Sequence, residues 1–183
     1  MLVRILRTTR LVADGRHLAF TTLCRWRDAI YLAYRAAPTH GIVPPGHVEI
    51  RRREQHGGHG EHRWSLSGIL RHPTGDVRDP RFVVSDEALW LVCGVYLPAA
   101  QHVAFQGLSA SSGDNLIVTH VAYTTDGATW SALQPILRPQ YWLWSVVPMA
   151  EAYVGAAYHT GRVGETSSIT LVAGDRLEAL LPL

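Results

Sequence analysis

The sequence predicts an all-β chain that forms a partial β-propeller of about three four-stranded blades. Three short apolar hairpins of similar pattern recur at 23–35, 82–94 and 145–158. Aromatic residues at matching places in these hairpins lie 59 and 63 residues apart. A repeat of this length with about four strands per unit is typical of propeller blades. No segment shows the sustained 3.6-residue apolar periodicity of a helix, so we expect little helix.

The first blade is expected to span 17–70, after an N-terminal strand within 1–16. Alternating apolar residues and a turn at Arg27-Asp28 predict a first hairpin, and the second hairpin is joined by a loop rich in glycine and histidine. The four strands expected in this blade are 18–26, 29–35, 47–53 and 63–66.

The second and third blades are expected at 76–138 and 141–183, which completes one partial propeller domain over 1–183. Asp126-Gly127 and Gly174-Asp175 stand between apolar runs, and such pairs are strong hairpin signals. The strands expected in the second blade are 81–84, 88–94, 116–124 and 129–133. Those expected in the third blade are 143–148, 152–158, 168–173 and 177–181.

Composition disfavours several classes of function. The 17 basic residues are all arginines spread along the chain and the net charge is only +2, so we expect no nucleic-acid partner. No run of 18 apolar residues is present, so we expect no membrane span. The N-terminus lacks the apolar region and cleavage site of a signal peptide, which favours the cytoplasm. A secreted domain that had lost its signal peptide would look the same.

The segment Thr-Thr-Asp-Gly-Ala-Thr-Trp at 124–130 resembles the Asp-box, or BNR repeat, of sialidase-like propellers. In such a turn the Asp126 carboxylate accepts backbone N–H bonds, and Gly127 supplies a positive φ. Trp130 is expected to pack between neighbouring sheets, and Thr124 completes the motif. We therefore expect these four residues to be structural rather than catalytic.

The openings of the three units extend this resemblance. HLAFTTLCRWRDAIYLAYR, VRDPRFVV and YWLWSVV resemble successive blade openings of bacterial sialidase-family proteins, and they span most of 17–158. The resemblance implies a sialidase-like propeller related to glycoside hydrolases, with a carbohydrate as its ligand. It covers only the first three blades of that family.

Candidate site residues come from the starts of the inner strands, which crowd around the channel mouth of a propeller. The aromatic residues would stack on sugar rings, arginines would clamp a carboxylate, and Asp79 is the candidate catalytic acid or base. Because Asp79 lies between two arginines, we expect its charged form to be favoured, which suits a base or an anchor. Equally, these charges could form a structural ion-pair network between blades. The candidate substrate-binding residues are His17, Phe20, Thr22, Arg78, Arg81 and Trp144.

We expect no cofactor and no metal. The loop at 56–62 holds three histidines, with His47 nearby, and imidazoles suit zinc, copper or nickel. Its glycines give no fixed spacing that would aim the rings, so a solvated loop is the favoured interpretation. No phosphate-binding loop, HExxH, GxSxG or paired CxxC motif occurs.

Three features of the family are missing here. Thr21 follows Phe20 where the family has an arginine. Ser145 follows Trp-Leu-Trp where relatives have a second arginine. The family's tyrosine nucleophile and its partner glutamate come from later blades. The leading hypothesis is therefore carbohydrate binding at the channel mouth, with hydrolysis only when the ring is completed, for example by a second copy. The alternatives are a non-catalytic carbohydrate- or protein-binding half-propeller and a truncated fragment.

Overall fold

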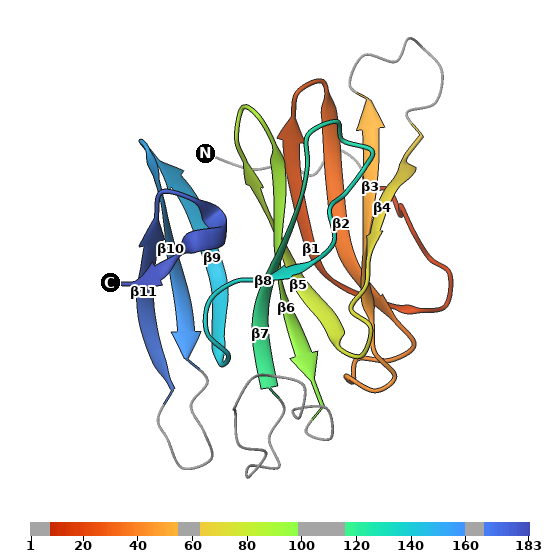
Figure 1. Ribbon diagram of the computed structural model, residues 1–183. Helices are drawn as coiled ribbons and strands as arrows, with labels where there is room; N and C mark the ends of the chain where they lie inside the picture. Colours follow the sequence, from red (N-terminus) through yellow and green to blue (C-terminus); the bar gives the residue numbers. More distant parts are fainter. Residues whose placement is uncertain (1–7, 55–62, 99–115, 160–166) are drawn as a thin grey trace, which may run out of the picture.

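The computed structural model describes residues 8–54, 63–98, 116–159 and 167–183, which form three four-stranded antiparallel sheets (Figure 1). The all-β, three-blade prediction is confirmed. Blade 1 contains, in sheet order, β1 (His17–Trp26), β2 (Ala29–Ala37), β3 (His47–Glu54) and β4 (Ser65–Leu70). Blade 2 contains β5 (Asp76–Val84), β6 (Leu89–Leu97), β7 (Leu116–Thr124) and β8 (Gln134–Pro135). Blade 3 contains β9 (Tyr141–Met149), β10 (Ala152–His159), β11 (Ser168–Gly174) and β12 (Leu181–Pro182).

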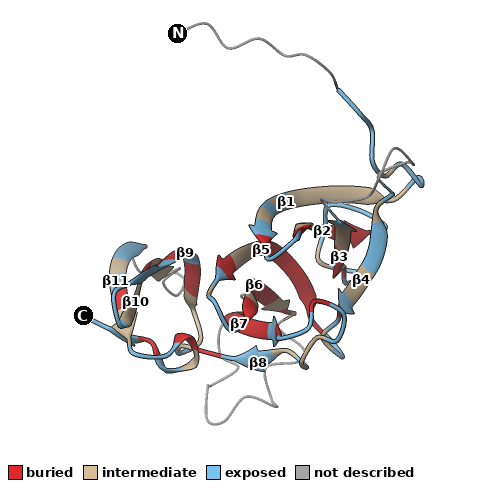
Figure 2. Ribbon diagram, turned by 90° about the horizontal axis from the view of Figure 1, so that it is seen from above, coloured by how far each residue is buried: buried red, intermediate tan, exposed pale blue. Residues whose placement is uncertain are grey.

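The blades stand side by side, and their first strands β1, β5 and β9 lie along one side of the row (Figure 2). These three strands begin at the lower end of the molecule in Figure 1. The sequence-predicted candidates at the strand starts therefore do come to one end of the fold. β1 contacts β5, and β5 contacts β9, so neighbouring blades meet along these inner strands.

The fourth strands differ most from the prediction. The strand expected at 63–66 is β4 at 65–70, and the one expected at 129–133 is only the two-residue β8. In blade 3, the expected strand at 177–181 is a 3-10 helix, Leu177–Ala179, followed by β12. Leu177 is fully buried, and a helical turn places it in the core where an edge strand would not. Residues 8–16 contain no strand, contrary to the expectation for the N-terminus.

Two apolar cores hold the blades together. The first lies between blades 1 and 2 and contains Tyr31, Val48 and Leu91. The second lies between blades 2 and 3 and contains Val121 and Leu143. Blades 1 and 3 thus each pack one sheet face against a neighbouring blade, whereas blade 2 packs both of its faces. Among the described residues, no helix has the length and apolar character that crossing a membrane requires.

Candidate functional site

Each inner strand carries one extra residue at the same place. Register shifts occur in β1 between Ala19 and Thr22, in β5 between Arg78 and Arg81, and in β9 at Trp144. Such bulges bend a strand and re-aim its side chains, and they are common next to active sites. These bulges could not be predicted from the sequence, because they interrupt the alternation of side chains only locally.

Two of these bulges have strained backbones. Phe20 and Asp79 occupy equivalent positions in β1 and β5, and their φ angles are 56° and 52°. Residues other than glycine rarely adopt a positive φ, and strain of this kind clusters at functional sites. Asp79 also precedes Pro80, which further disfavours helical backbone conformations. The repeat therefore holds a candidate ligand-binding residue in the same strained conformation in two blades.

The candidates of blades 1 and 2 contact one another through rings and guanidinium groups. The His40 ring, from the connection after β2, lies 5.1 Å from the His17 ring and 5.7 Å from the Phe20 ring. The Cζ atom of Arg78 lies 5.7 Å from the Phe20 ring centroid and 4.8 Å from that of Tyr96. The Nδ1 atom of His17 is buried and has no hydrogen-bond partner within the described part of the chain.

The same row continues into blade 3. The Trp142 ring lies 5.3 Å from the Tyr96 ring and 5.4 Å from the Trp144 ring. The Cζ atom of Arg81 lies 5.5 Å from the Trp144 ring centroid. Trp142 is buried, whereas Trp144 is 44% exposed and presents a ring to solvent. Thr22, another predicted residue, pairs with Ala33 in the sheet.

A buried ion network lies beneath this row, and Asp76 at its centre was not among the residues predicted from the sequence. Asp76 is fully buried and accepts hydrogen bonds from Arg35, from Arg78 Nε at 2.6 Å, and from the backbone N–H of Gly46. Arg35 is also fully buried and donates to the carbonyl groups of Thr39 and Gly41. The network joins the end of β2 to the start of β5. An arginine inside the apolar run of β2 was the one available signal.

The alternative interpretation, an ion-pair network between blades through Arg78, Asp79 and Arg81, holds only for Arg78. Arg78 pairs with Asp76, and Arg81 donates to the carbonyl of Pro80 at 2.8 Å. Asp79 is only 6% exposed, and no hydrogen bond or ion pair to it occurs among the described residues. Burial raises the pKa of Asp79, although the charges of Arg78 and Arg81 oppose this. The expectation that its surroundings favour the charged form is therefore corrected: their net effect is to raise the pKa of Asp79 above that of an ordinary aspartate.

The turn after β7 lies at the opposite end of the blade from these residues (Figure 1). One carboxylate oxygen of Asp126 accepts the backbone N–H groups of Ala128 at 2.8 Å and Thr129 at 2.7 Å, and the Thr124 hydroxyl at 2.9 Å. The backbone bonds, from Thr129 first, hold the pKa of Asp126 far below its usual range. Gly127 has a φ of 75°. These bonds shape a turn and leave the carboxylate remote from the channel mouth.

Trp130 extends from this turn onto blade 1. Its Nε1–H donates to the Ser67 hydroxyl at 3.2 Å, and that hydroxyl donates to the carbonyl of Gly127 at 2.9 Å. The indole lies directly over Gly68, where a Cβ atom would collide with it. Trp130 therefore packs between the two sheets, which also explains why residues 129–133 do not extend as a strand.

A second ion cluster lies on the face of blade 1 that points away from blade 2. Glu49 accepts hydrogen bonds from Arg16 Nη1 at 2.6 Å and from the Tyr34 hydroxyl at 2.7 Å, and Arg51 lies 3.2 Å away. Burial favours the neutral acid, but the bonds from Arg16 and Tyr34 outweigh it and lower the pKa of Glu49 to about 2. This cluster attaches the segment before β1 to the sheet.

The predicted histidine-rich loop at 56–62 lies outside the described residues. His47 is described, and its Nε2 atom lies 3.4 Å from Glu49. Within the parts of the chain that the structure describes, no group of three or more His, Cys, Asp or Glu side chains could hold a metal ion.

Comparisons with known proteins place the fold among carbohydrate-active propellers. No protein-family model matches the sequence, and no curated protein is similar to it. An N-acetylgalactosamine deacetylase from F. plautii, in complex with blood group B trisaccharide, shares the fold with a TM-score of 0.58 and 13% identity. The match covers 93% of this chain and 52% of that one.

Two further similar structures are of enzymes with different activities. An α-L-arabinofuranosidase from Lactobacillus brevis matches with a TM-score of 0.59 and 10% identity, over 93% of this chain and 56% of that one. A Trypanosoma rangeli sialidase in complex with the inhibitor DANA matches with a TM-score of 0.57 and 9% identity, over 87% of this chain and 29% of that one. The chain thus has the fold of propeller-type glycoside hydrolases and related enzymes, and spans about half the length of the first of these structures.

Proposed function

We propose that the chain binds a carbohydrate at the end of the fold where β1, β5 and β9 begin. The observation that carries this proposal is the repeated bulge, which presents Phe20, Asp79 and Trp144 from equivalent positions of three successive blades. Aromatic rings offer stacking faces for sugars, and Arg81 supplies hydrogen-bond donors beside Trp144. A mixture of apolar faces with a few convergent polar groups is the usual composition of a small-molecule site.

Asp79 is the proposed acid–base group of this site. Its carboxyl group is buried and free of hydrogen bonds among the described residues, and burial raises its pKa. A carboxyl group in this state retains a proton to higher pH than an ordinary aspartate, which is what a general acid requires. Its neighbours Arg78 and Arg81 would stabilise the carboxylate after proton transfer. The substrate class is left open between the sialidase-like assignment from the sequence and an arabinofuranosidase-like activity with the same fold.

Sugars bound in structures with this fold serve as probes, namely sialic acid in a sialidase, arabinobiose in an arabinanase and blood group B trisaccharide in the deacetylase. Binding of these three sugars is measured by calorimetry, and turnover is measured with the corresponding aryl glycosides. At least one sugar is expected to bind, with affinity reduced roughly two- to tenfold in Trp144→Ala by loss of ring contact. Asp79→Asn is expected to abolish turnover while binding persists, and Asp175→Asn at an exposed hairpin turn serves as the matched control. Failure of all three sugars to bind would refute the proposal.

A second candidate function is a binding module without catalysis. Thr21 and Ser145 stand where sialidase-family proteins have arginines, and this observation favours the alternative. It predicts that Trp144→Ala weakens sugar binding while no aryl glycoside is turned over by the wild-type chain. The two candidates therefore differ in one measurement, the turnover by wild-type protein.

We further propose that a second copy completes the ring around this site. The outward faces of blades 1 and 3 each carry exposed apolar side chains, and a sheet face of this kind favours association. We call these two faces the flanks. Their exposed members are Leu23, Leu66 and Ile69 on the blade 1 flank and Val147, Met149, Ile169 and Leu171 on the blade 3 flank.

Strand register supports the assignment of the blade 3 flank. In β10, Ala157 belongs to the core, so its neighbours Ala156 and Tyr158 lie on the opposite face of the sheet. Leu171 and Ile169 pair with these two neighbours and therefore also point away from blade 2. Ile169 is 76% exposed. Two copies related by a two-fold axis could cover both flanks at once and would bring two sets of Asp79 and Arg81 around one channel.

Light scattering at micromolar concentration tests the second copy. The expected mass is twice the 20.3 kDa of one chain. Ile169→Asp is expected to give monomers, because a charge would be buried in the proposed interface. Val43→Asp is the matched control, since Val43 is 67% exposed but lies in the β2–β3 connection, off both flanks. A stable wild-type monomer would overturn the proposal.

A further inference from the structure

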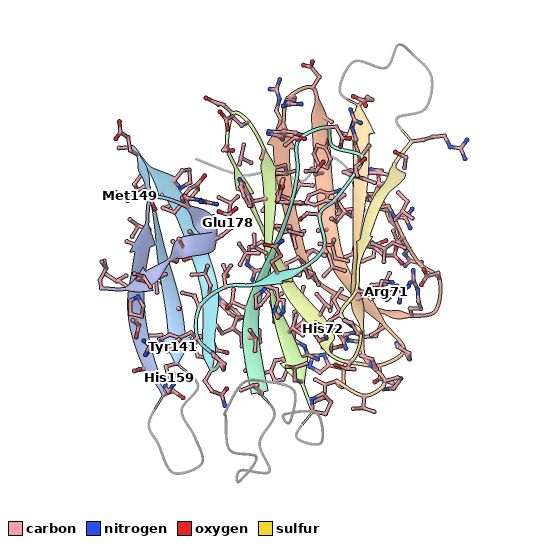
Figure 3. All side chains as sticks on the ribbon, in the orientation of Figure 1. Arg71, His72, Tyr141, Met149, His159 and Glu178 are labelled. Carbon is pink, nitrogen blue, oxygen red and sulfur yellow. The ribbon has the colours of Figure 1, made fainter. Side chains whose placement is uncertain are left out.

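A large cavity lies away from the channel mouth, between the outer strands of blades 1 and 2. Its volume is about 690 Å³, which lies within the usual range of small-molecule sites, ~300–1,000 Å³. The walls come from the connection between β4 and β5 and from the segment that leads into β8. Figure 3 shows Arg71 and His72 on this connection. None of the residues proposed for the channel mouth lines this cavity.

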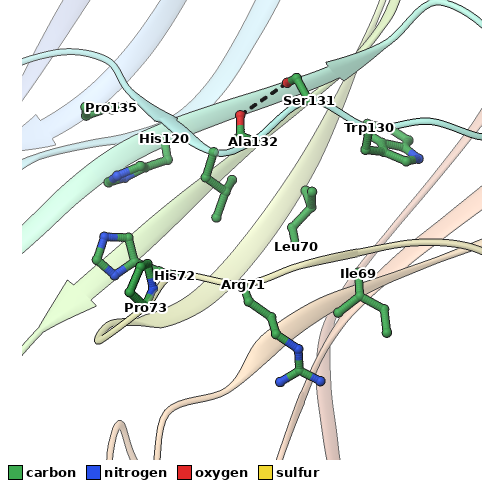
Figure 4. A pocket seen from close by; sticks show the side chains of 11 residues that line it. Ile69, Leu70, Arg71, His72, Pro73, His120, Trp130, Ser131, Ala132 and Pro135 are labelled. Atoms are coloured by element: carbon green, nitrogen blue, oxygen red, sulfur yellow. Dashed lines mark hydrogen bonds between the residues drawn. The ribbon is translucent and has the colours of Figure 1, made fainter.

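One end of the cavity is polar and the other is aromatic. His72 and His120 contact one another edge to face with ring centroids 5.5 Å apart, and Trp130 lies at the far end (Figure 4). Leu70 and Leu133 line the space between them. The cavity therefore combines an indole wall with two imidazoles, and apolar side chains separate the two.

The hydrogen bonds of the two imidazoles fix their tautomers. His120 Nδ1 lies 3.1 Å from the carbonyl oxygen of Val118, which only accepts, so Nδ1 carries the hydrogen. His72 Nδ1 instead accepts the backbone N–H groups of Thr74 at 3.3 Å and Gly75 at 2.9 Å, so its hydrogen is on Nε2. Burial lowers the pKa of both rings, that of His120 to about 4, so both are neutral at pH 7.

The two Nε2 atoms consequently offer complementary functions. His72 presents a donor, His120 presents an acceptor, and the described residues supply no hydrogen bond to either atom. His120 is 3% exposed, so its acceptor is reachable from the cavity rather than from the open surface. A hydroxyl group both donates and accepts, and it matches this pair as neither a carboxylate nor an ammonium group does.

We propose that this cavity is a second carbohydrate site, in which a neutral sugar directs hydroxyl groups to the Nε2 atoms of His72 and His120 and a ring face to Trp130. A carboxylate would meet the His120 acceptor unfavourably, and an ammonium would meet the His72 donor unfavourably. A metal ion is disfavoured because the His72 lone pair is already used on Nδ1. The site is independent of the channel mouth and would stand if that proposal failed.

The direct test uses the wild-type chain and the neutral disaccharide lactose. Lactose is titrated to ~10 mM, well above a dissociation constant of ~1 mM, while the ring ¹⁵N signals of the histidines are followed by NMR. The Nε2 signals of His72 and His120 are expected to shift together, and those of His17 and His40 at the channel mouth to stay unchanged. Glucuronate at the same concentration is expected to bind more weakly than lactose.

Variants separate this site from the first. His72→Phe keeps an aromatic ring but removes both ring nitrogens, the Nε2 donor among them, and it is expected to weaken lactose binding about fivefold. His159→Phe, in β10 beside Tyr141, is the matched histidine control and is expected to bind as the wild type does. Asp79→Asn is expected to leave lactose binding here unchanged.

Three outcomes would overturn the proposal. The first is the absence of shifts at His72 and His120 in the wild type, which does not depend on any variant folding. The second is tighter binding of glucuronate than of lactose, which would make the cavity an anion site beside Arg71. The third is a lactose response confined to the channel-mouth histidines.

Discussion

Replacing Asp76 with alanine should destabilise the chain strongly, because this carboxylate is the ion-pair partner of two buried guanidinium groups. Arg35 is fully buried and Arg78 is 8% exposed, and both donate to Asp76. Removal of one partner from a buried ion pair costs ~3–5 kcal/mol, since the remaining charge is left without compensation. The free energy of unfolding of a typical domain is only ~5–15 kcal/mol.

Urea unfolding followed by tryptophan fluorescence measures this loss. Asp76→Ala is expected to lower the midpoint with an unchanged slope, and to lower the melting temperature by ~6–20 °C at ~2–4 °C per kcal/mol for a chain of this size. Asp175→Ala, at an exposed turn, should stay within ~0.5 kcal/mol of the wild type.

A double variant tests the cause of the loss. Asp76→Leu combined with Arg35→Met removes both charges of the most buried pair, and it should recover part of the stability lost in Asp76→Ala, because only Arg78 is then left without its partner. A loss below ~1 kcal/mol in Asp76→Ala would refute the reasoning, because it would mean that water reaches the guanidinium groups.

Three further predictions concern the turn after β7, the segment before β1 and the joint between blades 2 and 3. Gly127→Ala should lower the free energy of unfolding more than Gly15→Ala, as measured by urea unfolding. Both glycines have a positive φ, but only a Cβ atom at Gly127 would collide with the Tyr31 hydroxyl. Tyr31→Phe should therefore remove the additional destabilisation of Gly127→Ala. Glu49 has a folded pKa of about 2, below its unfolded value, so its contribution is complete above about pH 5 and is lost as the pH falls towards 2. The stability gap between wild type and Glu49→Gln should therefore shrink over that range, and a constant gap would contradict the prediction. Thr119→Val removes hydrogen bonds to two backbone groups of β9 at 2.7 and 2.9 Å, and should cost ~1–3 kcal/mol and raise amide exchange in blade 3 before blade 1.

The strands could be predicted from the sequence wherever apolar alternation and a turn signal coincide. The segment 116–124, which Asp126-Gly127 follows, was predicted with its observed limits. The outermost strands could not be predicted in this way. Residues 129–133 have strand-like alternation, but Trp130 turns onto Gly68 of blade 1, and this long-range contact prevails over local propensity.

The candidate site could also be predicted only in part. The repeat predicted the site residues at the strand starts, because equivalent positions of successive blades meet at one end of the fold. The Arg35–Asp76 pair could not be found from spacing, because its members are 41 residues apart in the sequence. The state of Asp79 was mispredicted for a related reason: neighbours in sequence suggested ion pairs, whereas the bulge and Asp76 draw the guanidinium groups elsewhere.

The bulges explain how one repeated backbone could serve a site made of unlike residues. An inner strand without a bulge would alternate its side chains strictly between its two sheet faces. The extra residue breaks that alternation once per blade, at the same register, and takes one side chain out of the alternating pattern. Phe20, Asp79 and Trp144 occupy these positions, and none of them belongs to either apolar core, so their side chains can differ in chemistry without loss of the cores. Selection for ligand binding would therefore act on these three positions almost independently of selection for the fold.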